Sequence, residues 1–220
     1  MTFTDRLHQE TQAIWQASLN HPFIQGLAAG TLPVSTFRYY LIQDTQYLRA
    51  FSHLHELVAE RLPQADGERL LKLAASAGED THRNEILADL NLTSEEIAAS
   101  EMAPNNYSYI THMEHQLLVS TPASVTGLVP CYWLYAEIAQ NWQGQTSPNP
   151  IYQKFFDGYA GSDFTTSTKA LLELVNQLAE ISSLEEQEQM RTAFMRSSQF
   201  ELAFWQMAYT NQTWADLGKR

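Results

Sequence analysis

The most apolar stretch of the chain reads Val129-Pro130-Cys131-Tyr132-Trp133-Leu134-Tyr135-Ala136-Glu137. Cys131 is the only cysteine in 220 residues. On a helix, Cys131 and Tyr135 share a face because they are four residues apart. Pro130 cannot donate the backbone bond that a helix interior needs, so we expect a kink and a freed carbonyl near Thr126. Two interpretations stay open: a thiol aimed into a cavity, or a small buried hydrophobe, as many free cysteines are.

In nearly every other segment of the chain, apolar residues recur with the period of a helix. Almost no segment shows the alternation of apolar and polar residues that is typical of a strand. No composition shift or flexible linker divides residues 1–220. We therefore expect an all-α fold, a single-domain helical bundle that covers the whole chain. The longest near-continuous apolar run, Leu128 to Ala136, is too short to span a bilayer.

Helix boundaries follow from caps and prolines. Thr4 is expected to cap the first helix, Ser35 a long helix after Pro33, and Ser183 the last long helix. Asp66 is expected to begin a helix that continues to Leu90. Four shorter signals complete the pattern: a capping box at Thr93–Glu96, helix starts at Pro104 and Pro122, and a cap at Ser162 or Asp163.

The charge balance excludes several kinds of partner. Twenty-five acidic residues against thirteen basic ones give a net charge of -12. This disfavours binding to a nucleic acid, which needs clustered Lys and Arg, and to an anionic membrane surface. One cysteine cannot form an internal disulfide, and the first ten residues contain no apolar signal core. We expect a cytoplasmic protein.

Asp44 and Glu201, like Cys131, lie on the apolar faces of three different long predicted helices. Buried acids usually have a partner or a task. If the three groups converge, they offer a thiol nucleophile, a proton-transferring acid and a carboxylate that holds a donor group. The aromatic side chains that could form walls for a flat ligand are Tyr47, Tyr109, Tyr135, Tyr159 and Phe204. The alternative is that neighbouring tyrosines satisfy buried polar groups with no catalytic role.

Other motifs give weaker signals. Two carboxylates near a thiol oppose its ionisation, so we expect Cys131 to lose its proton only during attack. Glu79 and His82 form one Glu-x-x-His pair, whereas di-iron or di-manganese carboxylate sites need two pairs and further carboxylates. The neighbouring Ser197 and Ser198 are expected to form a close helix contact or a pocket wall.

Four motifs together carry a family resemblance. They are Gln43-Asp44-Thr45-Gln46-Tyr47-Leu48, Ser108-Tyr109-Ile110-Thr111-His112-Met113, Pro130-Cys131-Tyr132-Trp133-Leu134-Tyr135 and Phe200-Glu201-Leu202-Ala203-Phe204-Trp205. In order and spacing they resemble the TenA family (thiaminase II, aminopyrimidine aminohydrolase), in its cysteine-bearing group. The match extends over essentially the whole chain.

The resemblance implies a haem-oxygenase-like bundle that binds no haem, needs no metal or other cofactor and assembles as a homotetramer. It implies a hydrolase of thiamin salvage that converts 4-amino-5-aminomethyl-2-methylpyrimidine to its hydroxymethyl analogue and ammonia. Cleavage of thiamin is a related activity.

Matched by motif position, Cys131 resembles the family's nucleophile and Glu201 its acid/base. Asp44 resembles the carboxylate that orients the pyrimidine through its amino group. Five further positions resemble pocket residues: Tyr47, Tyr109, Tyr135, Tyr159 and Phe204. Thr45 departs from the family pattern, which often has an aromatic residue beside the aspartate. Two rival functions stay open, a non-catalytic pyrimidine-binding or regulatory protein on the same scaffold and a metal-dependent oxygenase that uses His82.

Overall fold

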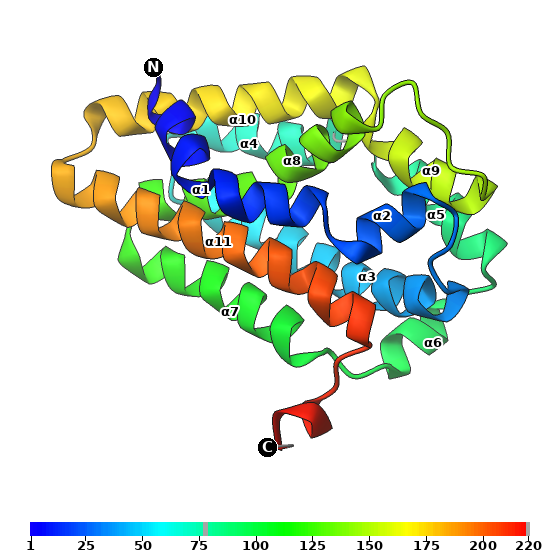
Figure 1. Ribbon diagram of the computed structural model, residues 1–220. Coiled ribbons are helices and arrows are strands. Elements are labelled where there is room, and N and C mark those ends of the chain that lie inside the picture. Colours follow the sequence, from blue (N-terminus) through cyan, green and yellow to red (C-terminus); the bar gives the residue numbers. More distant parts are fainter. Residues whose placement is uncertain (77–78, 219–220) are drawn as a thin grey trace.

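Helix α8 (Thr121–Asn141) lies at the centre of the molecule (Figure 1). It contacts α3 (Val34–Ala59), α7 (Pro104–Val119), α10 (Ser162–Ile181) and α11 (Leu184–Thr210), and α11 is its most extensive neighbour. Fourteen of its 21 residues are buried, which agrees with its nearly continuous apolar sequence. The helix runs through Pro130 without ending.

The computed structural model describes residues 1–76 and 79–218, and it describes the side chains of all of these except 76 and 79–81. Within this part of the chain, eleven α-helices are followed by a short 3₁₀ turn, η1 (Trp214–Gly218), and no strand occurs. The remaining helices are α1 (Phe3–Leu19), α2 (Pro22–Ala28), α4 (Gln64–Ser76), α5 (Glu79–Asp89), α6 (Ser94–Ala99) and α9 (Pro150–Tyr159). The expectation of an all-α fold is confirmed.

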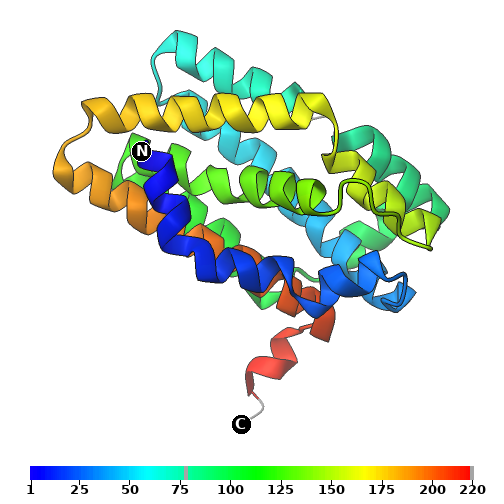
Figure 2. The same ribbon diagram turned by 45° about the horizontal axis from the view of Figure 1, so that its top comes forward.

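The helices differ in length according to where they lie. The long helices α1, α3, α7, α8, α10 and α11 form the bundle, and the short helices α2, α5, α6 and α9 gather at one end of it in both views (Figures 1 and 2). One connected hydrophobic cluster runs through the bundle and reaches the short helices. None of the helices in the described ranges has the length and apolar character needed to cross a membrane.

Local signals explain most of the helix ends. Ser183 begins α11 with a capping box, and the Thr93 side chain accepts a bond from the Glu96 N–H at the start of α6. Pro104 and Pro122 occupy the first turns of α7 and α8, where a missing N–H costs nothing. The predictions for α7, α8 and α11 are confirmed. The capping box at Thr93–Glu96 is only half formed, because the Glu96 carboxylate pairs with Arg38.

Three cap predictions are wrong by one or two residues. Thr2, not Thr4, caps α1, because its hydroxyl reaches the Asp5 N–H and Asp5 bonds back to Thr2. Pro33 takes the N-cap position of α3 with extended backbone, so Ser35 lies inside the helix. Gly161 takes the N-cap position of α10 instead of Ser162 or Asp163.

The predicted single helix from Asp66 to Leu90 includes residues 77 and 78, which lie outside the described residues. The structure has two helices, α4 and α5, in this region. At 100° per residue, Leu70 and Ile86 on one helix would lie about 160° apart, so they could not have shared a buried face. Both side chains are buried, Leu70 on α4 and Ile86 on α5.

Candidate functional site

Three long helices bring Asp44, Cys131 and Glu201 to one aromatic cluster. Asp44 comes from α3 and Glu201 from α11, and both are buried, with 3% and 2% of their surface exposed. Cys131 comes from α8 and is partly exposed. Close packing of α8 on α11 supports this arrangement, because a Cβ added at Gly127 would lie 3.7 Å from Ser197 Oγ.

Glu201 is held by a tyrosine. The Tyr109 hydroxyl on α7 donates a hydrogen bond of 2.7 Å to Glu201 Oε1. The Tyr109 ring in turn stacks on the Tyr47 ring at 5.2 Å and on the Phe200 ring at 5.3 Å. A carboxyl group is thus fixed at the edge of an aromatic wall.

Cys131 and Glu201 act on the same two tyrosines. Burial raises the pKa of Tyr47 well above its ordinary value of 10, and the charges of Cys131, Tyr109 and Glu201 raise it further. Burial also raises the pKa of Tyr109, and again the charges of Glu201 and Cys131 add to the rise. The thiol and the carboxyl group therefore lie within electrostatic reach of one tyrosine pair, and both tyrosines stay protonated at neutral pH.

Asp44 has a different kind of partner. It forms a buried ion pair with Arg83 of α5, and Tyr40, one turn before it on α3, bonds to it. Burial raises the pKa of the Asp44 carboxyl, and the adjacent Arg83 guanidinium and the Tyr40 hydroxyl oppose the rise. The Tyr40 and Tyr135 hydroxyl groups lie 3.2 Å apart.

Ring contacts join the two halves of the site. Tyr135 packs on Tyr159 of α9 at 4.7 Å, and burial, followed by the charges of Tyr40, Asp44, Glu201 and Tyr159, raises its pKa. Phe204 contacts Tyr40 at 6.0 Å and Tyr47 at 5.7 Å. All eight residues singled out from the sequence therefore belong to one connected cluster, with Asp44 and Tyr159 at one end and Tyr109 and Glu201 at the other.

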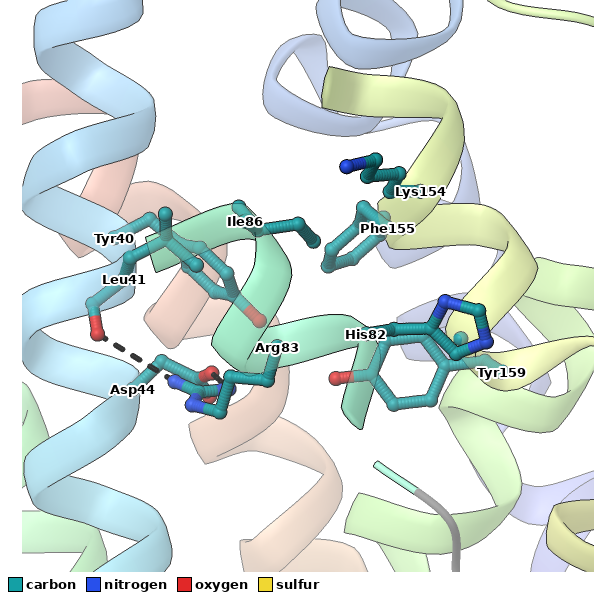
Figure 3. A pocket seen from close by; sticks show the side chains of 10 residues that line it. Tyr40, Leu41, Asp44, His82, Arg83, Ile86, Lys154, Phe155 and Tyr159 are labelled. Atoms are coloured by element: carbon teal, nitrogen blue, oxygen red, sulfur yellow. Dashed lines mark hydrogen bonds and ion pairs between the residues drawn. The ribbon is translucent and has the colours of Figure 1, made fainter. Parts of the chain in front are cut away.

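A small pocket opens at the Asp44 end, between α3, α5 and α9 (Figure 3). Its volume of about 20 Å³ is enough for roughly one water molecule. In Figure 3 the Tyr159 ring lies beside His82, and Arg83 reaches across to Asp44. The residues that line the pocket are Tyr40, Leu41, Asp44, His82, Arg83, Ile86, Lys154, Phe155, Gly158 and Tyr159.

Arg83 and Tyr40 are the site residues that sequence reasoning missed. Tyr40 lies on the buried face of α3, where an aromatic side chain by itself indicates only core packing. Arg83 lies on α5 at three and seven residues before the buried Ile86 and Leu90, so it occupies an apolar helical face much as Asp44 does. That spacing was the available signal. Thr45 accepts a bond of 3.1 Å from Arg83 Nη2, which gives this unusual residue a contact in the site.

A second buried polar pair lies behind the aromatic wall. His55 Nδ1 donates to the Phe51 carbonyl at 2.7 Å, so Nε2 accepts from the Tyr132 hydroxyl at 2.9 Å. Burial lowers the pKa of His55 to about 4, although the bond to Phe51 acts in the opposite direction. The ring is therefore neutral at pH 7. Phe51 stacks on Tyr47 at 5.2 Å and connects this pair to the site.

The hypothesis of a metal site near His82 needs several ligands close together. His82 lines the pocket, while the Glu79 side chain lies outside the described residues. Among the side chains that the structure describes, no group of three or more His, Cys, Asp or Glu residues could hold a metal ion. Ser198 accepts a bond from Trp15 Nε1 at 3.2 Å and Ser197 faces Gly127, so the prediction of a helix contact is confirmed for this pair.

Sequence comparisons identify the relatives of this chain. The family model described as TENA/THI-4/PQQC matches residues 8–211. An aminopyrimidine aminohydrolase of Bacillus subtilis strain 168 is 32% identical over 223 residues, which cover 98% of this chain and 93% of that protein. A relative of the same name from Halalkalibacterium halodurans is 30% identical and covers 97% of this chain and 98% of its own length.

Solved structures share the fold. A TenA homologue from P. horikoshii OT3 superposes with a TM-score of 0.87 at 27% identity and covers 96% of this chain and 99% of its own. A domain with a heme oxygenase-like fold from Shewanella denitrificans OS217 superposes with a TM-score of 0.68 at 16% identity and covers 94% of this chain and 92% of its own. The expected haem-oxygenase-like bundle is confirmed. From the family match and the full-length relatives, the chain belongs to the TENA/THI-4/PQQC family.

Proposed function

We propose that this chain is an aminopyrimidine aminohydrolase of thiamin salvage that uses Cys131 for covalent catalysis. Its substrate is 4-amino-5-aminomethyl-2-methylpyrimidine, and its products are the hydroxymethyl analogue and ammonia. The observation that carries the proposal is the convergence of Cys131, Glu201 and Asp44 from three helices on one aromatic cluster. Full-length relatives with this activity in their names support the same substrate class.

The site residues have distinct tasks in the proposed mechanism. Asp44 accepts a hydrogen bond from the ring's amino group, and the rings of Tyr47, Tyr109, Tyr135, Tyr159 and Phe204 form the walls. Cys131 adds to an electron-poor ring carbon while Glu201 protonates a ring nitrogen. The adduct expels ammonia from the exocyclic methylene, water adds there, and the thiol departs. Covalent catalysis divides one difficult displacement into an addition and an elimination.

The position of Glu201 supports its role as the acid. Proton transfer requires a carboxyl group that can take up and release a proton within hydrogen-bond reach of the ring. Tyr109 fixes one oxygen of Glu201 at 2.7 Å, and the Tyr109 hydroxyl stays protonated because burial raises its pKa. The same tyrosine lies near the charge of Cys131, so the acid and the nucleophile act on one side of the cluster.

The test is turnover of the aminomethylpyrimidine, read as the hydroxymethyl product by mass spectrometry and as released ammonia. Cys131→Ser should lose nearly all of this rate while its circular dichroism spectrum and melting temperature stay close to those of the parent protein. Ser124→Ala is a matched control on α8, because the Ser124 hydroxyl only donates to the Thr121 carbonyl of its own helix.

A Cys131→Ser protein that keeps its rate would overturn the covalent mechanism. Binding of the pyrimidine without turnover at any pH would favour the non-catalytic alternative. The related cleavage of thiamin is measured in the same assay through release of the thiazole.

The proposal includes a homotetramer in the cytoplasm. Light scattering on the purified protein should give four times the mass of one chain, and a monomer mass would contradict the tetramer.

A further inference from the structure

Arg83 lies in the lining of the pocket and links two helices. It belongs to α5, whose main packing partner is α9, and it contacts three groups on α3. Its Nη1 atom pairs with Asp44 Oδ2, and Nη2 lies 3.1 Å from Thr45 Oγ1 and 3.5 Å from the Leu41 carbonyl. The planar guanidinium thus engages the Asp44 and Thr45 side chains and the Leu41 carbonyl, which fixes its direction. Figure 3 shows its contacts with Asp44 and Leu41.

The stability of the fold does not explain this pair. Both side chains are buried, with Arg83 8% and Asp44 3% exposed. Removing two charges from water costs several kcal/mol, and apolar residues of similar volume often hold such positions equally well. The pair also lies in the lining of a pocket that contains Tyr159, another residue of the proposed pyrimidine site. Its position therefore favours a role in that site.

The surroundings of Asp44 show why a cation matters there. Burial disfavours the charged form of Asp44, and Arg83 is the first of the groups that oppose this effect. Among the described residues, the ionisable groups near Asp44 or in the lining of its pocket are Tyr40 of α3, His82 and Arg83 of α5, Tyr135 of α8, and Lys154 and Tyr159 of α9. Lys154 lies 2.7 Å from Asp89 Oδ2 and 3.5 Å from Glu85 Oε2, so its charge is balanced by those acids.

We propose that Arg83 is a positioning residue for substrate recognition, which holds the Asp44 carboxylate ionised and in a fixed orientation. This inference rests on the proposed function, because it concerns how Asp44 receives the amino group of a pyrimidine. An ionised carboxylate offers only acceptor lone pairs and suits an N–H donor. Without Arg83, we expect the Asp44 carboxyl group to be protonated, so that it carries an O–H donor, and to have no fixed orientation.

The test measures binding of the reaction product, 4-amino-5-hydroxymethyl-2-methylpyrimidine, by calorimetry between pH 6.5 and 9. Arg83→Met removes the charge at nearly constant volume. It should weaken binding about tenfold at pH 7, because the amino group of the ligand then loses a hydrogen bond to a charged acceptor. Binding should recover as the pH rises, because Asp44 then ionises without Arg83. Arg83→Lys keeps the charge and should keep a pH profile like that of the parent protein.

Arg69→Met is the matched control. Arg69 also joins two helices, since its Nη2 atom bonds to Glu173 Oε2 at 3.0 Å and to the Ala170 carbonyl at 3.3 Å. This variant should leave the pH profile of binding unchanged. If Arg83→Met does not fold, Arg83→Gln takes its place, since it keeps a donor for Thr45 and removes the charge.

Three results would overturn the inference. These are affinity within twofold of the parent at every pH, a loss of affinity that is the same at every pH, and tighter binding at pH 7 through a neutral Asp44. The readout needs no turnover, so it is separate from the proposed function. A parent protein that binds the pyrimidine without releasing ammonia contradicts the hydrolase only, whereas a flat Arg83→Met profile beside normal turnover contradicts the role of Arg83 only.

Discussion

The two buried carboxyl groups of the site have opposite kinds of partner. Asp44 is held by a guanidinium, and Glu201 is held by the neutral hydroxyl of Tyr109. A cation favours the charged form of an acid, whereas a tyrosine donor adds no full charge to that preference. The same burial can thus serve two tasks, a fixed acceptor on α3 and a proton-transferring group on α11. This division of roles is the proposal that the following experiments test.

The largest expected effect is on the rate. Glu201→Gln should lower kcat by a factor of about 10²–10⁴, the usual contribution of a general acid or base, with a smaller change in KM. Ammonia release at saturating substrate measures it. Glu137→Gln is the control. Glu137 on α8 is also an acid with a single side-chain partner, His8 at 2.6 Å, but it is not one of the proposed site residues. A Glu201→Gln rate within tenfold of the parent would mean that Glu201 is not the proton-transferring acid. The proposed difference in role between Glu201 and Asp44 would then be wrong.

The next effect is on stability, and it should be specific to Asp44. Asp44→Asn leaves the Arg83 charge buried without its carboxylate, which costs about 3–5 kcal/mol of unfolding free energy. Urea denaturation at pH 7 measures the loss. Adding Arg83→Met to Asp44→Asn should recover much of it, because no buried charge then remains at that position.

Glu201→Gln serves as the comparison here too. Its loss should be smaller, since the Tyr109 hydroxyl can still donate to the amide oxygen. Equal losses in Asp44→Asn and Glu201→Gln would mean that the two partners do not differ as the structure indicates.

A third effect is the loss of stability at low pH that is caused by His55. It limits the pH range in which the Asp44 and Glu201 variants can be compared. Burial lowers the pKa of His55 to about 4, below the value of about 6.5 that it has in the unfolded chain. Above pH 6.5 both states are neutral, and as the pH falls toward 4 only the unfolded state takes up the proton. The unfolding free energy should therefore fall by about 3 kcal/mol between these pH values.

Urea denaturation at pH 7 and 4.5 checks the role of His55. His55→Gln should lose this part of the acid sensitivity. His53→Gln, an exposed side chain two residues earlier on the same helix, should keep it. If the unfolding free energy of His55→Gln falls between pH 7 and 4.5 as much as that of the parent, other groups cause the acid sensitivity.

The smallest effect concerns the hydrogen bond on Glu201. Tyr109→Phe removes that bond and little volume, so kcat should fall about three- to tenfold, as the loss of about 0.5–1.5 kcal/mol implies. The pH profile of kcat should shift as well, because Glu201 loses a donor to its charged form. Tyr107→Phe is the control on the same helix, since Tyr107 is 54% exposed. A Tyr109→Phe enzyme with the parent's kcat and pH profile would leave Glu201 positioned by other groups.

Much of the architecture could be predicted from local signals. Helical period and prolines place α7 and α8, and Ser183 places the start of α11, because these signals act within one or two turns. The errors arise at helix ends where a contact with another residue determines which of two possible residues is the cap. Thr2 and Thr4 are both good caps, and only the bond back from Asp5 distinguishes them.

The site could be predicted in part. Asp44 and Glu201 drew attention because an acid on an apolar stripe needs a partner, but the sequence could not identify either partner. Arg83 is 39 residues away from Asp44, and Tyr109 is 92 residues away from Glu201, so each pair depends on the packing of helices.

The single cysteine has a consequence for redox chemistry. Oxidation of Cys131 to a sulfenic acid would leave it with no second thiol in the chain, so no internal disulfide could protect it from further oxidation. Recovery then depends on a thiol supplied from outside, such as glutathione. A protein that places its only sulfhydryl in a partly exposed position of its proposed site therefore relies on the reducing power of its surroundings.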